Sequence, residues 1–354
     1  MKINKILVEI HHGLGDVVQM IPLIENLRNS YAKAKISVIV ASDSHADLLK
    51  CTNLVDEYYF LNLRKMKIID VVSFIFKIRK EKYDICFLSP ISNKTLGLLM
   101  MHILGCKNKV MEVKKTPKIF NRNNIYSIEN IECHRIYRNL KLLDASNISV
   151  SNKYPVINLS VDRYKRCIDK LKVLRQNKKL IAICVGTNAV QNKKNFKTSF
   201  FDAKKWSIES YIQLINKLKG KYNIIIIGGK KEEDEVKGYL NNLECEDKII
   251  NFINMTSIME SAALLTRCDL VLGADTGMMH IADALGVNTL TLFGPTNPRL
   301  VGPISPSSNY ITLNLSCQYC YGTEKLFECT DRKCINNISV EQVLNEIENI
   351  LNYE

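Results

Sequence analysis

The sequence predicts an α/β protein with two doubly wound domains. Apolar runs rich in β-branched residues alternate with helical patterns, which indicates right-handed β-α-β units around a parallel sheet covered by helices on both faces. This series occurs twice in a chain of 354 residues, a length that exceeds one ordinary hydrophobic core. A polar, basic stretch with one proline, roughly at 150–178, separates the two series.

The first series predicts four strands and four helices. The opening stretch MKINKILVEI carries Asn4 and Glu9 and offers no small-residue cleavage site, so we interpret it as the first strand of a cytoplasmic protein rather than a signal peptide. The strands span 5–10, 36–41, 55–60 and 84–89, and the helices span 17–30, 67–80, 92–104 and 130–146.

The second series predicts five strands, at 180–185, 223–228, 248–251, 269–274 and 288–293, with helices at 207–219, 231–242, 256–267 and 277–286. We therefore expect domains at 1–158 and 159–354, the second ending in a terminal helix. Ligands of open parallel sheets bind beyond the carboxyl ends of the strands. The expected site is consequently the cleft between two facing sheets.

The charge balance favours an anionic partner. Lys and Arg number 49 against 36 Asp and Glu, a formal net charge of +13. Nucleic acid, an anionic membrane face and a phosphorylated substrate all fit, and a compositional bias toward Lys, Asn and Ile would explain the charge without any partner. Aromatic residues do not interleave with the basic ones, so nucleic acid is the least favoured. The apolar runs are too short to span a bilayer.

Residues 273–298 carry the clearest local signal for a ligand. A buried strand is followed by DTGMMHIADALG, a helix start whose amides at Thr276, Gly277 and Met278 lack intrahelical partners. The helix dipole favours a negative group there, and Gly277 lets that group approach the backbone. The alternatives are that Asp275 is an N-cap without a ligand and that His280 only packs in the core.

A second rigid loop, LFGPTNP, follows the next strand, and its Gly-Pro and Asn-Pro pairs favour a fixed turn at the same sheet edge. Two adjacent loops of this kind predict a phosphate-binding edge.

Five motifs together resemble glycosyltransferase family 9, the ADP-heptose:lipopolysaccharide heptosyltransferases and their relatives. The resemblance covers essentially the whole chain. It implies a GT-B fold of two Rossmann-like domains and inverting, metal-independent transfer from a nucleotide-sugar, with no catalytic cofactor. The motifs are GLGDVVQMIPLIENLR (13–28), VGTNA (185–189), KKWSIESY (204–211), IIIIGGKKEE (224–233) and the combination of DTGMMHIADALG with LFGPTNP.

In the first domain, the resemblance implies that Asp16 is the catalytic base, which takes a proton from the attacking hydroxyl. The alternative is that Asp16 is the N-cap of the helix 17–30. Gly15 keeps the loop low enough for the substrates, and His12, where the family commonly has a small residue, lies on the acceptor side.

In the second domain, the resemblance implies a donor site. Lys204 contacts the diphosphate, although the adjacent Lys205 is an alternative, and Ser207 stands where the family usually has proline. Glu232 takes the ribose hydroxyls, with Glu233 an equal candidate by spacing. The remaining donor residues are Thr187, Asp275, Thr276, Gly277, Met278 and His280.

Acceptor binding is expected in the first domain, in the basic segment 107–124. We assign this segment to an anionic glycolipid such as a phosphorylated lipopolysaccharide core, and a solvated basic loop is the alternative. His134 and Arg135 could extend the same surface. The candidate contacts in the segment are Lys114, Lys115, Lys118 and Arg122.

Four of the 12 cysteines, Cys317, Cys320, Cys329 and Cys334, have the spacing C-x2-C-x8-C-x4-C. This spacing is typical of metal ligands and predicts a structural zinc or iron, with reduced thiols or disulfides as the alternative. The other eight cysteines are interpreted as small hydrophobic residues.

The leading hypothesis is a cytoplasmic glycosyltransferase, in peripheral contact with the inner membrane face, that moves heptose from ADP-heptose to a lipopolysaccharide core or another surface glycan. A second is a transferase of the same fold with a protein acceptor. A third is a nucleotide-sugar-binding protein without catalysis, which would follow if Asp16 only caps its helix.

Overall fold

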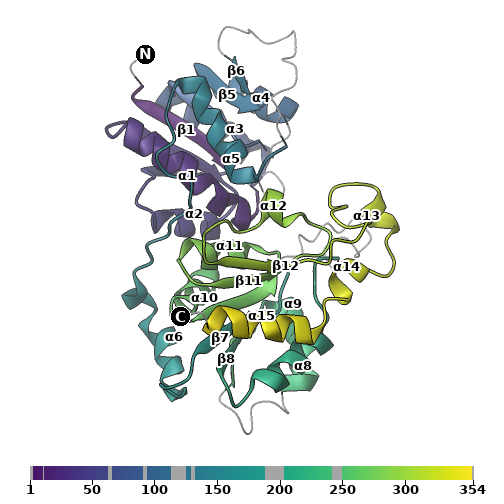
Figure 1. Cartoon of the computed structure of the whole chain (residues 1–354). Coiled ribbons are helices and arrows are strands. Elements are labelled where there is room, and N and C mark those ends of the chain that lie inside the picture. Colours follow the sequence, from purple (N-terminus) through teal and green to yellow (C-terminus); the bar gives the residue numbers. More distant parts are fainter. Residues whose placement is uncertain are drawn as a thin grey trace. The chain divides into compact units, whose positions relative to one another are not determined.

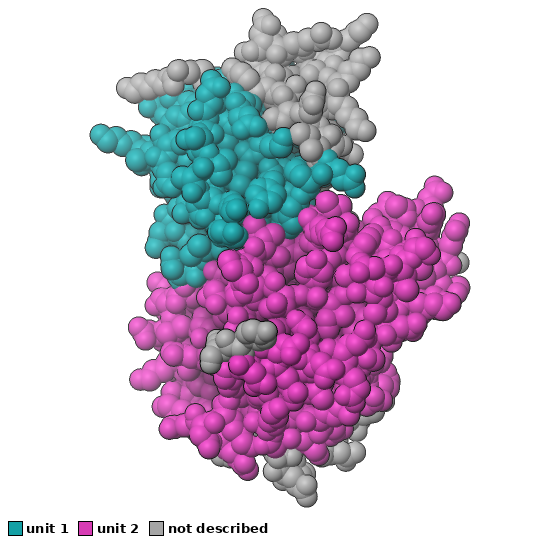
Figure 2. All heavy atoms as spheres, viewed as in Figure 1, with its two compact units in different colours: residues 1–158 teal, residues 159–354 magenta. Residues whose placement is uncertain are grey.

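The computed structural model describes residues 3–10, 12–62, 66–90, 94–112, 125–128, 132–187, 203–240 and 249–352. The chain forms two compact units, residues 1–158 and 159–354, shown in Figures 1 and 2. Each unit is built on a six-stranded sheet in which every strand pair is parallel. Among the described residues, no helix has both the length and the apolar character needed to cross a membrane.

The sheet of the first unit has the strand order β3-β2-β1-β4-β5-β6. The order reverses between β1 and β4, so the chain changes direction across the sheet at β1. Right-handed crossovers then place α1 and α2 on one face and α3 and α4 on the other. The elements are β1 (Lys5–Ile10), α1 (Leu14–Ser30), β2 (Lys35–Val40), α2 (Asp43–Lys50), β3 (Glu57–Phe60), α3 (Ile68–Glu81), β4 (Ile85–Leu88), α4 (Lys94–Ile103), β5 (Asn108–Glu112), β6 (Ile125–Ile128), α5 (Arg135–Leu140) and the 3₁₀ helix η2 (Lys141–Ser146).

The sheet of the second unit has the order β12-β11-β10-β7-β8-β9. The C-terminal helix α15 packs beside α8, and its Val343, Ile347 and Leu351 complete the core under the sheet. The elements are η3 (Val161–Tyr164), α6 (Lys165–Asp169), η4 (Lys170–Val173), β7 (Leu180–Cys184), α8 (Ile208–Leu218), β8 (Asn223–Ile227), α9 (Lys230–Leu240), β9 (Ile249–Asn251), α10 (Ile258–Leu265), β10 (Leu270–Ala274), α11 (Gly277–Ala284), β11 (Thr289–Leu292), α12 (Pro298–Val301), β12 (Ser308–Ile311), α13 (Lys325–Glu328), α14 (Lys333–Asn336) and α15 (Val340–Asn352).

The strand β5 corrects the prediction of one basic loop at 107–124. All five residues of β5 are buried, and the Lys109 ammonium turns inward to donate to the Cys106 carbonyl at 2.7 Å. Burial lowers the pKa of Lys109. The first part of the predicted acceptor segment is therefore core. Its four candidate contacts, Lys114, Lys115, Lys118 and Arg122, lie outside the described residues.

The interpretation of the scattered cysteines as single hydrophobic residues was wrong for one pair. Cys86 in β4 and Cys106, just before the neighbouring strand β5, form a disulfide with Cα atoms 6.2 Å apart. Sequence alone could not show this pair, because it is created by the parallel pairing of two strands.

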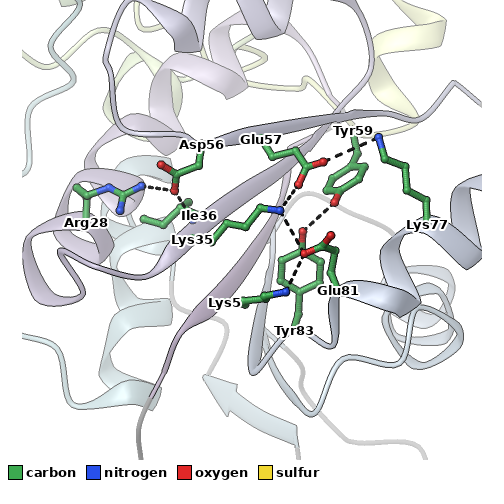
Figure 3. Close-up of polar contacts among 10 residues, drawn as sticks. All are labelled: Lys5, Arg28, Lys35, Ile36, Asp56, Glu57, Tyr59, Lys77, Glu81 and Tyr83. Carbon is green, nitrogen blue, oxygen red and sulfur yellow. Dashed lines mark hydrogen bonds and ion pairs between the residues drawn. The ribbon is translucent and has the colours of Figure 1, made fainter.

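Charged residues join the amino-terminal ends of three strands in the first unit (Figure 3). The ammonium of Lys35, at the start of β2, lies 2.6 Å from a Glu57 oxygen and 3.2 Å from a Glu81 oxygen. Glu81 also accepts from Lys5 at 2.9 Å. The hydrogen bonds from Lys5 and then Lys35 lower the pKa of Glu81, and the bond to Glu57, with that to Glu81, raises the pKa of Lys35 to about 12.

This network predicts a pH-dependent contribution to stability. Because the pKa of Glu81 is lowered in the folded state, its contribution is present above the unfolded value of about 4.3 and is lost as the pH falls through the folded value. We expect Glu81→Gln to lower the free energy of unfolding by about 0.5–1 kcal/mol at neutral pH, since the ion pairs are partly exposed. Urea denaturation at neutral and acidic pH measures the difference, which should vanish at the acidic end. The control is Glu346→Gln on α15, and an equal loss in both variants would contradict the prediction.

Candidate functional site

Asp16 lies in the first turn of α1, just after β1. The helix begins at Leu14 with Gly13 as its N-cap, three residues earlier than predicted, so the alternative of Asp16 as the N-cap is wrong. Asp16 instead occupies the third helical position, where its Oδ2 accepts from the Gly13 amide at 3.0 Å. Its Oδ1 accepts from Arg135 Nη1 at 2.6 Å. One carboxylate oxygen orders the loop, and the other is paired with a cation.

Arg135 reaches Asp16 because α5 packs against α1. His134 is the N-cap of α5, and its Nδ1 accepts from the Ile136 amide at 3.2 Å. Asn139 of α5 donates to the Gln19 carbonyl of α1 at 2.8 Å, which holds the two helices together. Arg135, expected only as an extension of the acceptor surface, is thus a direct neighbour of the candidate base.

His45, on α2, was not predicted as a site residue. It is buried, and its Nδ1 lies 3.1 Å from Ser42 Oγ. Burial lowers the pKa of His45; the negative charge of Asp16 opposes that shift and His12 adds to it. His45 is therefore a neutral imidazole close enough to Asp16 and His12 to interact with their charges. The signal that could have identified it is topological, since α2 follows β2, the strand beside β1.

In the second unit, Asp275 follows β10 directly. The N-cap of α11 is Thr276, so the alternative of Asp275 as the N-cap is wrong. Asp275 is buried, with Oδ2 2.7 Å from Lys204 Nζ and Oδ1 3.9 Å from His280 Nε2. Burial by itself would raise the pKa of Asp275, but the charges of Lys204 and then His280 outweigh it and lower the pKa. Asp275 is a carboxylate at neutral pH, next to a helix start with open amides at Gly277 and Met278.

The structure distinguishes the two adjacent lysines. Lys204 faces Asp275, whereas Lys205 forms an ion pair with Glu235 of α9. Trp206 is fully buried and donates from Nε1 to the Ile338 carbonyl at 3.0 Å, which anchors this segment to the core. Ser207, where the family usually has proline, is the N-cap of α8.

Tyr321 is a further residue of this site that sequence reasoning missed. Lys204 Nζ lies 4.4 Å from the centre of its ring, within the range of a cation–π interaction. The Tyr321 amide donates to the Pro295 carbonyl at 3.0 Å, and Gln318 Nε2 donates to the Phe293 and Gly294 carbonyls, both at 3.0 Å. The segment that holds the cysteines is therefore bound to the GPTNP loop at the carboxyl edge of the sheet.

Glu232 and Glu233 also differ in burial and in their hydrogen-bond partners. Glu232 is buried, and its Oε2 accepts from the Gly229 amide at 2.9 Å, while its Oε1 has no hydrogen-bond partner among the described residues. A Cβ on Gly186 would lie 3.0 Å from this carboxylate. Glu233 is exposed and accepts from Asn254 at 2.8 Å.

Unpartnered polar atoms gather at this edge. Besides Glu232 Oε1, the buried hydroxyl oxygens of Thr187 and Thr276 lack hydrogen-bond partners within the described residues. Buried polar atoms are normally satisfied, so these atoms, which belong to the loops after β7, β8 and β10, indicate a place for a polar ligand.

The structure does not support the predicted metal centre. Over the part of the chain that the structure describes, no group of three or more His, Cys, Asp or Glu side chains is placed to hold a metal ion. The four cysteines are neighbours nevertheless. Burial, with smaller effects of Cys320, Cys329 and Cys317, raises the pKa of Cys334 to about 11.

Two α/β units, each built on a six-stranded parallel sheet, have the architecture of the GT-B fold. A family model, glycosyltransferase family 9 (heptosyltransferase), matches residues 71–331. The chain belongs to this family, and it is a glycosyltransferase.

Relatives and solved structures agree with this assignment over the whole length. The chain is 22% identical to lipooligosaccharide heptosyltransferase 2 of Campylobacter jejuni, with 98% of each chain covered. It shares its fold with the ADP-heptose lipopolysaccharide heptosyltransferase II of Escherichia coli, with a TM-score of 0.76 at 20% identity and 99% of each chain covered. The iron-containing dodecameric glycosyltransferase TibC of enterotoxigenic E. coli is similar with a TM-score of 0.57 at 13% identity, covering 100% of this chain and 80% of TibC.

The Trp206 anchor can be tested without any ligand. Trp206→Phe removes the donor to the Ile338 carbonyl and leaves that carbonyl buried without its partner, which should lower the free energy of unfolding by about 1–3 kcal/mol. Urea denaturation followed by circular dichroism measures both the midpoint and the slope of unfolding. The midpoint should fall, and the slope should stay unchanged. If the variant is as stable as wild type, packing alone holds the segment around Trp206 and the hydrogen bond contributes nothing.

Proposed function

We propose that the enzyme transfers heptose from ADP-heptose to the core of lipopolysaccharide or lipooligosaccharide. The end-to-end similarity to lipooligosaccharide heptosyltransferase 2 carries this proposal, and the polar edge of the second unit supports it. We further propose that the protein is cytoplasmic, that transfer inverts the anomeric configuration and that no metal takes part.

The second unit would bind the nucleotide-sugar. The open amides of Thr276, Gly277 and Met278 suit the diphosphate, with Lys204 as the cation that offsets its charge. Asp275 holds Lys204 in place and leaves an oxygen for a sugar hydroxyl, while His280 lies 3.9 Å from that carboxylate.

The nucleoside part of the donor has its own candidate partners. Within the described residues Glu232 Oε1 and the Thr187 hydroxyl have no hydrogen-bond partner, so the first can accept a ribose hydroxyl and the second can bind phosphate or ribose.

The first unit would supply the base. An acceptor hydroxyl attacks the anomeric carbon and gives its proton to Asp16, while the bond between that carbon and the diphosphate oxygen breaks and the diphosphate leaves with the electron pair. Arg135 and the Gly13 amide orient the carboxylate. The neutral His45 adds no positive charge beside it.

The acceptor is expected on the same side of the first unit, near His12 and Gly15. Arg135 adds a cation for a phosphorylated sugar, and the candidate contacts Lys114, Lys115, Lys118 and Arg122 would extend the basic surface.

A thermal-shift panel of ADP-, GDP-, UDP- and dTDP-sugars tests the donor assignment. A ligand at 100 times its dissociation constant adds about 2.7 kcal/mol to stability. We expect the largest shift with ADP-heptose, and an equal or larger shift with another nucleotide-sugar would contradict the donor assignment.

Asp16→Asn tests the base. Asn keeps the shape and can still accept from the Gly13 amide, and the ion pair with Arg135 that it loses is partly exposed, so stability should change by less than about 1 kcal/mol. Turnover should fall about 10²- to 10⁴-fold because the proton acceptor is lost, with donor affinity nearly intact. Initial rates and donor dissociation constants are compared with Asp47→Asn on α2, an exposed carboxylate paired with Lys50. Near-normal turnover of Asp16→Asn would remove Asp16 from the mechanism.

Lys204→Ala and Lys205→Ala form a matched pair for the donor site. The first should weaken ADP binding by about 1.5–3 kcal/mol, because a charge-assisted bond to phosphate is lost. The second removes only an ion pair with Glu235 and should leave affinity unchanged. Isothermal titration with ADP measures both, and the reverse order of effects would transfer the role to Lys205.

A further inference from the structure

Helix α3 of the first unit exposes apolar side chains along one side. Ile68, Ile69 and Phe76 are 85%, 73% and 61% exposed, and Val72 lies between them at 43%. The spacing i, i+1, i+4 and i+8 places all four within an arc of about 100°. The opposite side of the helix is buried in the core of the unit. Helix α3 therefore has two apolar sides, of which the core covers one.

Helix α4 extends this exposed surface. Leu96, Leu99 and Ile103, at i, i+3 and i+7, are 63%, 43% and 39% exposed. The two helices share the same buried core cluster, and Arg79 Nη1 of α3 donates to the Ile103 carbonyl of α4 at 2.5 Å. Figure 1 shows both helices in the first unit. We call this surface the apolar stripe, which comprises Ile68, Ile69, Val72, Phe76, Leu96, Leu99 and Ile103.

The exposed charges beside the apolar stripe are mainly positive. Lys67, Arg79, Lys80 and Lys82 are exposed on or next to α3. The two carboxylates of α3 are turned to other partners, since Asp70 accepts from the Lys67 amide at 3.0 Å and Glu81 accepts from Lys5 and Lys35. The sequence of α4 contains no carboxylate. The stripe is therefore complementary to an anionic surface.

The amino-terminal ends of the apolar stripe and the candidate base lie at the same edge of the first sheet. Helices α3 and α4 follow β3 and β4, so their amino-terminal ends lie at the carboxyl edge of the parallel sheet, the edge that also carries Asp16. The most exposed apolar side chains, those of Ile68, Ile69 and Leu96, are at these ends.

Exposed apolar side chains on two neighbouring helices, bordered mainly by cations, are typical of helices that lie in a membrane interface. We propose that the apolar stripe docks on the surface of an anionic lipid bilayer. The apolar side chains enter the headgroup region, and the flanking Lys and Arg contact lipid phosphates. Docking would bring the enzyme to its acceptor, and this role rests on the proposed function, since a glycolipid acceptor is held in a bilayer. The docking itself needs neither donor nor acceptor.

The test is co-sedimentation of the full chain with vesicles of equimolar phosphatidylglycerol and phosphatidylcholine, and with vesicles of phosphatidylcholine alone. Wild type should bind the anionic vesicles more tightly, and added salt should weaken that binding. Ile69→Ser combined with Phe76→Ser should weaken it at least about tenfold, and Lys80→Glu more than about fivefold.

Matched controls are Val173→Ser and Lys165→Glu, an exposed apolar and an exposed basic residue of the second unit, which should bind as wild type does. Thermal unfolding and ADP affinity should stay unchanged in every variant, so that failure of docking is distinguished from failure of the proposed transfer.

Equal binding of wild type to both kinds of vesicle would overturn the proposal. So would undiminished binding by the double variant or by Lys80→Glu. If wild type is a dimer that the double variant breaks while vesicle binding is retained, the stripe is instead an interface between two copies of the chain.

Discussion

Parallel strands run in one direction, so in each six-stranded sheet the loops that lead into the following helices gather at one edge. Asp16 and His45 come from the loops and helices after β1 and β2, which are neighbours in the first sheet. Asp275 follows β10, and Thr187 and Glu232 lie beyond β7 and β8 of the second sheet. Residues that are far apart in sequence become neighbours in each unit because of this alignment.

The amino edge of the first sheet and the carboxyl edge of the second sheet differ in how their polar groups are satisfied. At the amino edge, Lys35 is held by two carboxylates, and Arg28 bonds Asp56 at 2.6 Å while Asp56 accepts from the Ile36 amide at 2.7 Å. These groups are mutually satisfied and contribute to stability. The second unit shows the contrast, since its carboxyl edge leaves a Glu232 oxygen and threonine hydroxyls without partners in the described residues. Unsatisfied polar atoms are unfavourable for folding and are retained where a ligand completes them.

Two of the candidate carboxylates, Asp16 and Asp275, are each paired with a cation from a distant segment. Arg135 and Asp16 are 119 residues apart, and Lys204 and Asp275 are 71 residues apart. Such pairs restrict the side chains to one geometry before substrate binds, and preorganisation of this kind is the main source of electrostatic catalysis. The ring of Tyr321 under Lys204 adds a third contact. Because Tyr321 lies in the cysteine segment, that segment takes part in shaping the site and not only in closing the fold.

The sequence by itself determined the fold class and most of the strands, because alternating apolar runs and helix starts are local patterns. It also indicated the loops that carry Asp16, Lys204 and Asp275. It missed three short strands, β5, β6 and β12, whose residues are NKVME, IYSI and SNYI. Pairing with β4, β5 and β11 makes them strands, and such pairing is not a local property.

Tertiary structure alone decided which of the adjacent candidates face the polar sheet edge of the second unit. Lys204 and Lys205, or Glu232 and Glu233, have the same chemistry and nearly the same sequence position, and only the direction of each side chain separates them. His45, Arg135 and Tyr321 enter the sites through packing between elements, as does the disulfide between Cys86 and Cys106. A local pattern specifies the helix or strand on which a residue lies. The residue's partner in space depends on the strand order of the sheet, which brings distant segments together.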